Sequence, residues 1–146
     1  MRAIVAGLAL IALAACGGDS STARSNGSVV GTWTLQTYNG KPLPFTGSPN
    51  GNGSVDRVDS GSISFDANRN YVLGIKIVNI LGSTVNLQDF NEVGSYSGNA
   101  TTGVILKPND LSSGTSTAPF PTVSVTVSGN TLSFSQDGKP LTFVRR

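Results

Sequence analysis

The sequence contains no histidine, and Cys16 is its only cysteine. Without histidine, neither a Ser-His-Asp triad nor a Cys-His pair can form. The usual zinc sites need histidine or several cysteines, so the chain is a poor candidate for one. A single cysteine forms no disulfide within the chain. The hydrophobic core must therefore hold the fold by itself, even in an oxidising compartment.

Charge is also scarce. The chain has 10 Lys and Arg residues against 8 Asp and Glu residues, and they are scattered singly. Proteins that bind nucleic acid or an acidic membrane surface through side chains show a basic stripe or block, which is missing here. The glycines are dispersed among turns and form no phosphate-binding loop. We therefore predict no nucleic-acid partner.

Two carboxylates alone can hydrolyse a glycoside when they flank the substrate. The close carboxylate pairs in this chain are Asp56 with Asp59 and Asp89 with Glu92. Neither pair lies in a recognisable motif, and our interpretation is that all four are solvated loop charges. We predict no catalytic residue, no cofactor and no enzymatic activity.

Asp66, Asn68 and Asn70 have the spacing that opens a calcium-binding loop. Such a loop needs glycine at its sixth position and glutamate at its twelfth. Tyr71 and Ile77 occupy those two positions here. Because Asp and Asn bond readily to their own backbone, the segment instead predicts a hairpin turn and no metal site.

The N-terminus has the features of a secretory signal. Met1-Arg2 is a short basic start, and Ala3 to Leu13 is a run of small and apolar residues. This run is too short for a membrane span, which needs about 20 residues. Leu13-Ala14-Ala15-Cys16 resembles the lipobox of bacterial lipoprotein signal peptides. The resemblance implies that residues 1–15 are removed and that Cys16 receives acyl chains such as palmitate, which anchor the protein in membrane lipid.

The alternative is an ordinary secretory peptide, cleaved near Ala15, that leaves an unmodified thiol. In either case residues 16–28 are small and polar and predict a flexible tether with a reach of roughly 20 Å. In lipoproteins of two-membrane bacteria, aspartate after the cysteine resembles an inner-membrane retention signal. Gly17 stands there instead, with Asp19 close by. We predict a location in the cell envelope, at the outer membrane, facing the periplasm or the cell surface.

Residues 29–146 are predicted to form one domain of short strands. The first covers Gly31–Tyr38, where small or apolar residues alternate with polar residues at the two-residue period of a half-buried strand. One face carries Gly31, Trp33 and Leu35, and the other carries Thr32, Thr34 and Gln36.

Similar alternation predicts further strands at Val55–Phe65, Tyr71–Ile80, Thr84–Phe90, Val93–Ser97, Thr102–Lys107, Val123–Val127, Leu132–Phe134 and Leu141–Phe143. Gly47–Ser54 is predicted to be a mobile loop, and Pro108–Pro121 a second loop. Gly129-Asn130 and Asp137-Gly138 predict tight hairpins. Gly61, inside a strand, predicts a bulge or a tight bend.

About nine short strands without an amphipathic helix predict an all-β fold. We predict a single antiparallel β-barrel of about eight to nine strands, because closure removes the exposed edges that make open sheets associate. Trp33 is expected to plug one end of this barrel.

The two ends of the domain resemble the lipocalin-like branch of the calycin barrels. Gly31-Thr32-Trp33-Thr34-Leu35, followed by Asn39-Gly40-Lys41-Pro42-Leu43, is similar to the opening of small bacterial lipocalin-like lipoproteins, and Leu141-Thr142-Phe143-Val144-Arg145 to their ending. The internal Thr-Asp-Tyr motif of true lipocalins has no counterpart, and no helix is predicted before the last strand. The resemblance therefore implies the barrel and does not extend to a transport function.

The resemblance also implies a contact between the two ends. In lipocalins a basic side chain of the last strand lies across the tryptophan of the first. Leu141, Phe143 and Arg145 share one face, so we predict that Arg145 covers Trp33 in a cation–π contact. The alternative is a core tryptophan with an unrelated surface arginine.

Functions of different classes stay open. A barrel of eight strands either holds one small ligand or is filled by its own side chains. In the first case the protein would bind a small hydrophobic molecule or lipid, and a cavity of ~300 Å³ or more would favour this. Its hypothetical lining is Trp33, Leu35, Ile63, Phe65, Tyr71, Leu73, Ile75, Ile77, Val125, Phe134 and Phe143.

The second case is a solid-core module that acts through its surface, and it needs no ligand. A calycin-type protease inhibitor comes last, because those inhibitors rely on a disulfide that this chain lacks. The sequence identifies no protein partner for any of these functions.

Overall fold

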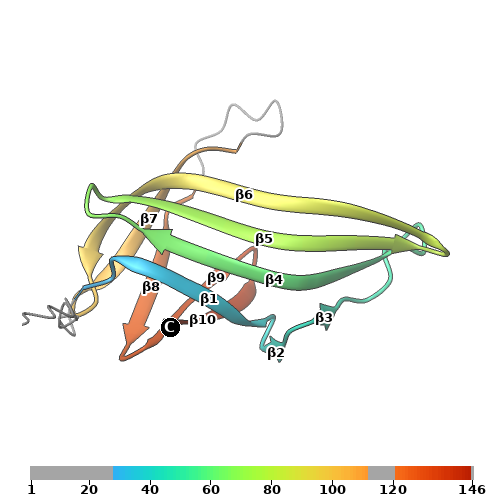
Figure 1. Ribbon diagram of the computed structural model, residues 1–146, viewed down its shortest axis with the longest axis horizontal. Coiled ribbons are helices and arrows are strands. Elements are labelled where there is room, and N and C mark those ends of the chain that lie inside the picture. The colour runs from blue at the N-terminus through green and yellow to red at the C-terminus, as the bar shows by residue number, and fades with distance from the viewer. Residues whose placement is uncertain (1–27, 112–120, 146) are drawn as a thin grey trace, which may run out of the picture.

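The computed structural model describes residues 28–111 and 121–145. Within these ranges the chain forms ten β-strands and no helix, so no helix there is long and apolar enough to cross a membrane (Figure 1). The predicted signal peptide, Cys16 and Gly17 lie outside the described residues. The strands are β1 (Gly31–Tyr38), β2 (Lys41–Pro42), β3 (Phe45–Thr46), β4 (Val55–Phe65), β5 (Asn70–Leu81), β6 (Thr84–Asn99), β7 (Gly103–Leu111), β8 (Val123–Ser128), β9 (Thr131–Gln136) and β10 (Lys139–Arg145).

All ten strands belong to one sheet, in the order β2-β1-β10-β9-β8-β7-β6-β5-β4-β3, and every pairing is antiparallel. β1 pairs with β10 on one side and with β4 on the other, so eight strands close into a barrel. Along the closing seam Gly31 lies opposite Phe65, and Thr34 opposite Ser62. β2 and β3 are short additional strands beside β1 and β4. The predicted antiparallel barrel is confirmed.

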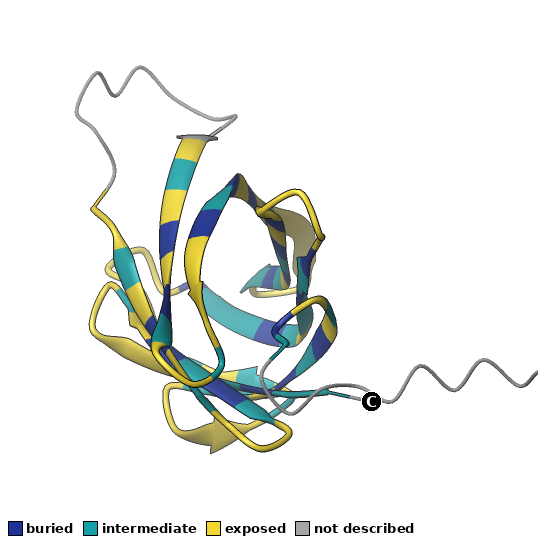
Figure 2. Ribbon diagram, turned by 90° about the vertical axis from the view of Figure 1, so that its left-hand side faces the viewer, coloured by how far each residue is buried: buried dark blue, intermediate teal, exposed yellow. Residues whose placement is uncertain are grey.

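Alternate residues of the barrel strands point into a single core (Figure 2). In β5, for example, Tyr71, Leu73 and Ile75 are buried, whereas Val72 and Lys76 are exposed. Burying one such large apolar side chain stabilises a protein by about 1.5–3 kcal/mol relative to leaving it in water. The core cluster is Val29, Trp33, Leu35, Val58, Ile63, Phe65, Tyr71, Leu73, Ile75, Tyr96, Val104, Leu106, Val125, Leu132, Phe134, Leu141 and Phe143.

A register shift in β1 changes which of its residues face the core. The pairing with β10 shifts between Leu35 and Thr37, so Gln36 is an extra residue of the bulge type. As a result Tyr38, and not the residue before it, packs against the core. Strict alternation from Trp33 would place Tyr38 on the outer face.

A second shift lies in β4, between Val58 and Ser60, where Asp59 is the extra residue. The bulge expected at Gly61 therefore occurs two residues earlier. Gly61 itself allows a close approach between strands, because a Cβ there would lie 2.9 Å from Leu35 Cδ2. The shift turns Val58 into the core, where it is buried.

Two strands are longer than predicted. β6 is continuous over Thr84–Asn99, although the sequence suggested two strands separated near Asn91. β7 continues through Pro108 to Leu111, where a loop was predicted to begin. Pro108 lies opposite Gly94, and the pairing shifts directly after it, so that Asn109 is an extra residue; prolines within sheets are found beside such bulges.

The barrel has two different ends. At one end the first residues of β1 pair beside the β4–β5 turn, and we call this the closed end because Trp33 fills it. The other end, which we call the open end, holds Tyr38 and the β9–β10 turn at Asp137-Gly138. β4, β5 and β6 continue beyond it as a long ribbon (Figure 1).

Candidate functional site

The closed end is sealed by the tryptophan and arginine that the two chain ends supply. Trp33 is completely buried, and its Nε1 donates a hydrogen bond to the Val29 carbonyl at 2.9 Å. Arg145 Cζ lies 4.3 Å from the centre of the Trp33 ring, and Nη2 donates to the Ser28 carbonyl at 2.6 Å. The predicted cation–π contact is present in the structure. Trp33 and Arg145 thus close this end of the barrel.

The hypothetical ligand-lining residues form a packed core. Phe134 stacks on Phe143 with 5.5 Å between ring centres, and Phe65 meets Tyr71 at 6.4 Å. Trp33, Leu35 and Leu73 are buried in the same cluster. Ile63 and Val125 are buried there too, and Ile77 packs at its margin. Of this set, Ile75 and Ile77 also line a cavity, which lies at the open end.

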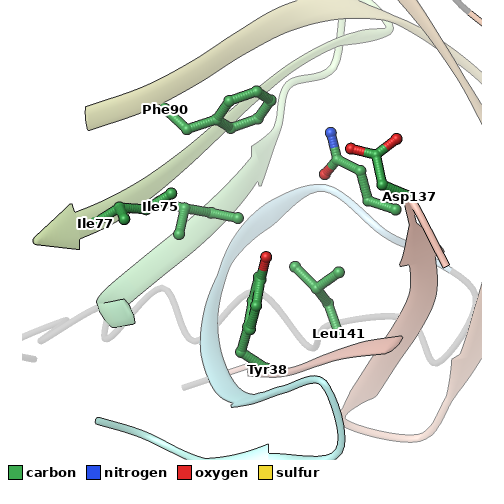
Figure 3. A pocket seen from close by; sticks show the side chains of 7 residues that line it. Tyr38, Ile75, Ile77, Phe90, Asp137 and Leu141 are labelled. Atoms are coloured by element: carbon green, nitrogen blue, oxygen red, sulfur yellow. The ribbon is translucent and has the colours of Figure 1, made fainter. Parts of the chain in front are cut away.

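The cavity at the open end, called here the mouth cavity, has a volume of about 150 Å³. Figure 3 shows Ile75, Ile77 and Phe90, from β5 and β6, on one side and Tyr38 and Leu141, from β1 and β10, facing them. Gln136 and Asp137 complete the lining at the β9–β10 turn. The walls are therefore apolar, and the polar groups gather at one rim.

A second cavity of about 310 Å³ adjoins the first, because Tyr38 and Ile77 line both. Its apolar wall adds Phe45 and Val58, and the Tyr38 and Phe45 rings lie 5.6 Å apart. Its polar wall includes Asn39, Asn50, Asp56, Gln88 and Lys139. Together the two cavities are called here the mouth site. It is a depression at the open end with one apolar and one polar wall.

The loop between β3 and β4 borders the mouth site and is held in place by side chains. Ser54 is buried, and its Oγ donates to Asn52 Oδ1 at 2.7 Å. Asn79 donates to Asp56 Oδ1 at 2.7 Å, and Asn50 donates to Asp56 Oδ2 at 3.2 Å. These two bonds hold the pKa of the Asp56 carboxyl below its usual value. The segment predicted as a mobile loop is thus tied to β4 and β5.

A buried carboxylate, that of Glu92, lies further into the barrel than the mouth cavity. Glu92 is 6% exposed and follows Phe90 on the inward face of β6. Tyr71 Oη donates to its Oε1 at 2.6 Å, and Gln136 Nε2 donates to its Oε2 at 3.3 Å. Burial, and then this carboxylate, raise the pKa of the Tyr71 hydroxyl. The phenol thus donates its hydrogen bond to a buried carboxylate.

The interpretation of the four carboxylates as solvated loop charges is wrong, because Asp56 and Asp59 lie in β4 and the other two lie in β6. Glu92 departs furthest from it, since it points inward and is buried. Asp89 points outward from the same strand and lies opposite Lys76. Asp59 pairs with Arg57 at 2.6 Å. Within the described ranges no three Asp, Glu, His or Cys side chains gather closely enough to hold a metal ion.

The Asp66–Asn70 segment forms the predicted hairpin turn. Asp66 Oδ1 accepts a hydrogen bond from the backbone N–H of Asn70 at 2.8 Å, and Oδ2 accepts one from the Asn70 side chain at 3.0 Å. These bonds, with help from Asn68, hold the pKa of the Asp66 carboxyl below its usual value. Its acceptor atoms serve the turn itself.

Sequence reasoning missed Tyr38, Phe90 and Leu141 as lining residues of the mouth cavity. Tyr38 was hidden by the bulge before it, which reverses the alternation of β1. Phe90 is the last residue of the predicted strand Thr84–Phe90, whereas β6 continues to Asn99. Leu141 does share the inward face of its strand with Phe143, which is the one signal that could have found it.

Comparison with protein-family models, with curated proteins and with solved structures found no match. The function is therefore argued from the geometry of the mouth site and from the sequence.

Proposed function

We propose that this protein is a lipid-anchored envelope protein whose barrel binds a small, mainly apolar molecule at its open end. The observation that carries this proposal is the mouth site, whose apolar wall includes Tyr38, Ile77 and Phe90. Its larger cavity, of about 310 Å³, reaches the ~300 Å³ that favours ligand binding, whereas the mouth cavity alone, of about 150 Å³, does not. A concave, apolar site with few polar groups is the usual form of a small-molecule site. The packed core below the cavity limits the ligand to the mouth.

The size and polarity of the mouth site define the ligand class. Its two cavities, about 150 and 310 Å³, reach the lower part of the range of roughly 300–1,000 Å³ that is usual for ligand pockets. A fatty acyl chain end or a small ring system would lie against Ile77 and Phe90. Gln136, Asp137 and Lys139 would orient a polar group at the rim.

The predicted anchor fits this arrangement. Acylation of Cys16 and the tether of residues 16–28 would join the barrel at Ser28, which contacts Arg145 at the closed end. The open end would then face away from the attachment point. We infer residence at the outer membrane, with the barrel on the periplasmic or outer side. The resemblance to small bacterial lipocalin-like lipoproteins supports the lipid anchor and the barrel.

A solid-core interaction module is the alternative function, and the tightly packed interior favours it. A calycin-type protease inhibitor stays a third possibility without a structural observation in its favour. In both cases the mouth site would hold no ligand, so a direct binding test separates them from the main proposal.

The test has two parts. Native mass spectrometry of protein extracted from its own membrane should show a bound apolar molecule. In addition, Ile77→Trp, which fills both cavities, should weaken binding of the fluorescent probe N-phenyl-1-naphthylamine at least about tenfold, equivalent to about 1.4 kcal/mol.

The matched control is Val72→Trp, which adds the same ring on the outer face of β5, where Val72 is 51% exposed. This variant should bind the probe like the parent chain. If neither the parent chain nor the control binds an apolar molecule, the interaction module is the better function. If Ile77→Trp binds as the parent does, the site lies elsewhere.

A further inference from the structure

The first half of β6 is an open strand edge among the described residues. β5 pairs with β6 along its whole length, but β7 pairs only with Glu92–Asn99. Within residues 28–111 and 121–145, residues 84–91 therefore have a strand on one side only. This edge is about 27 Å long at 3.4 Å per residue. Natural sheets usually cover such an edge or protect it with charge, proline or a bulge.

The opposite edge of the ribbon is covered. β3 pairs with β4 through Phe45 and Thr46, and Gly47 N–H donates to the Asp56 carbonyl at 2.8 Å. The β6 edge carries no proline and one charged residue, Asp89, near its inner end, and no register shift interrupts its pairing with β5. The two edges of one ribbon thus differ in a way that leaves β6 available for pairing.

The outer face of this edge is apolar. Val85 is 60% exposed and Leu87 is 68% exposed. On the neighbouring strand Ile80 lies opposite Val85, and Val78 opposite Leu87. No charged residue occurs between Lys76 and Asp89, so the whole tip of the ribbon is neutral. Exposed apolar side chains beside free backbone groups favour a partner strand over lipid, which would leave those backbone groups unsatisfied.

We propose that this edge pairs with the same edge of a second copy of the chain, around a two-fold axis at Asn86. In that antiparallel register Val85 of each copy lies opposite Leu87 of the other, and Thr84 lies opposite Gln88. Two rows of apolar side chains then cross the four adjacent strands. Each row consists of Val78 and Leu87 of one copy, followed by Val85 and Ile80 of the other.

Charge and register select this arrangement. An axis at Leu87 would place Val85 opposite Asp89, and an axis at Gln88 would place Leu87 opposite Asp89. The axis at Asn86 keeps both carboxylates outside the apolar rows and several residues apart. Such an isologous contact closes on itself and consumes both free edges, so it forms a dimer and not a fibre.

Cysteine cross-linking of the full chain in its membrane tests the register. Residues directly opposite in an antiparallel pair have Cα atoms about 4.5–5.5 Å apart, which suits a disulfide. Asn86→Cys should therefore give a disulfide-linked dimer. Thr84→Cys lies on the same edge, but its Cα atoms would be about 14 Å apart, too far for a bond. We expect at least about fivefold more dimer from Asn86→Cys than from Thr84→Cys. Cys16 is common to both variants and to the parent chain, which gives the background.

A second substitution tests the apolar rows. Leu87→Lys, added to Asn86→Cys, should abolish the dimer, because two lysines would face the apolar rows of the partner. Val72→Lys, at an exposed position of the barrel wall, should leave the dimer unchanged. Equal cross-linking of Asn86→Cys and Thr84→Cys, a dimer that survives Leu87→Lys, or a cross-link to a different protein would each overturn the proposal.

Discussion

At the scale of single residues, the closed end depends on one side chain from each end of the domain. Trp33 has its indole N–H satisfied by the Val29 carbonyl and its ring covered by the Arg145 guanidinium. Arg145 also donates to the Ser28 carbonyl. One arginine therefore joins the last strand to the first and to the segment that precedes it.

Arg145→Ala should destabilise the fold by about 1–3 kcal/mol, because it removes a desolvated cation–π contact and a charged hydrogen bond. Urea unfolding measures this loss, and the emission of Trp33 should move to longer wavelength as water reaches the ring. Lys41→Ala, on the exposed strand β2, is the control and should leave both quantities unchanged. An unchanged free energy of unfolding for Arg145→Ala would contradict a sealing role.

Glu92 is the second residue whose surroundings matter. It brings a carboxylate into the barrel, and the described hydrogen bonds to it come from Tyr71 and Gln136. Gln136 also lines the mouth cavity. A ligand at the rim would therefore contact the same amide that reaches the buried carboxylate.

At the scale of elements, β6 has two parts with different surroundings. Its second half is a barrel strand between β5 and β7, and its first half is an edge of the ribbon with no second partner strand in the part of the chain that the structure describes. Gly94 lies in the barrel part, opposite Tyr71 and Pro108. A Cβ at this position would overlap the Lys107 carbonyl oxygen and lie 2.6 Å from Tyr71 Cε1.

Gly94→Ala should therefore cost about 3 kcal/mol or more, because backbone on one side and a buried ring on the other leave no room for the methyl group. Thermal unfolding followed by circular dichroism measures the loss. Gly51→Ala is the matched control, since nothing lies within 4 Å of a Cβ there, and it should change stability by less than about 0.5 kcal/mol. Similar stability of the two variants would show that the barrel wall yields at Gly94.

At the scale of the whole molecule, one sheet forms the entire barrel and one cluster forms its core. β1 contacts both β10 and β4, so the barrel cannot open at one seam without exposing the core to water. The closed end, the core and the mouth site are thus parts of one cooperative unit.

Unfolding in urea should accordingly be a single transition. Trp33 fluorescence reports the closed end, and far-ultraviolet circular dichroism reports all strands; the two midpoints should coincide, as in other small single domains. An earlier transition of the Trp33 signal would mean that the closed end opens separately from the rest of the barrel.

The sequence alone determined the class of fold and much of the core, because two-residue alternation and turn residues are local properties. Asp137-Gly138, for instance, makes the predicted turn with positive φ at both residues. The contact of Arg145 with Trp33 also followed from a shared face and a family resemblance.

Only the tertiary structure decided the parts that depend on strand pairing. The bulges at Gln36 and Asp59 appear only when a partner strand defines the register, and they turn Tyr38 and Val58 toward the core. The position of the cavity depends on which side chains fill the barrel, and the edge of β6 over residues 84–91 is unpaired among the described residues because β7 pairs only with Glu92–Asn99. These features arise between residues far apart in the chain, so no local pattern encodes them.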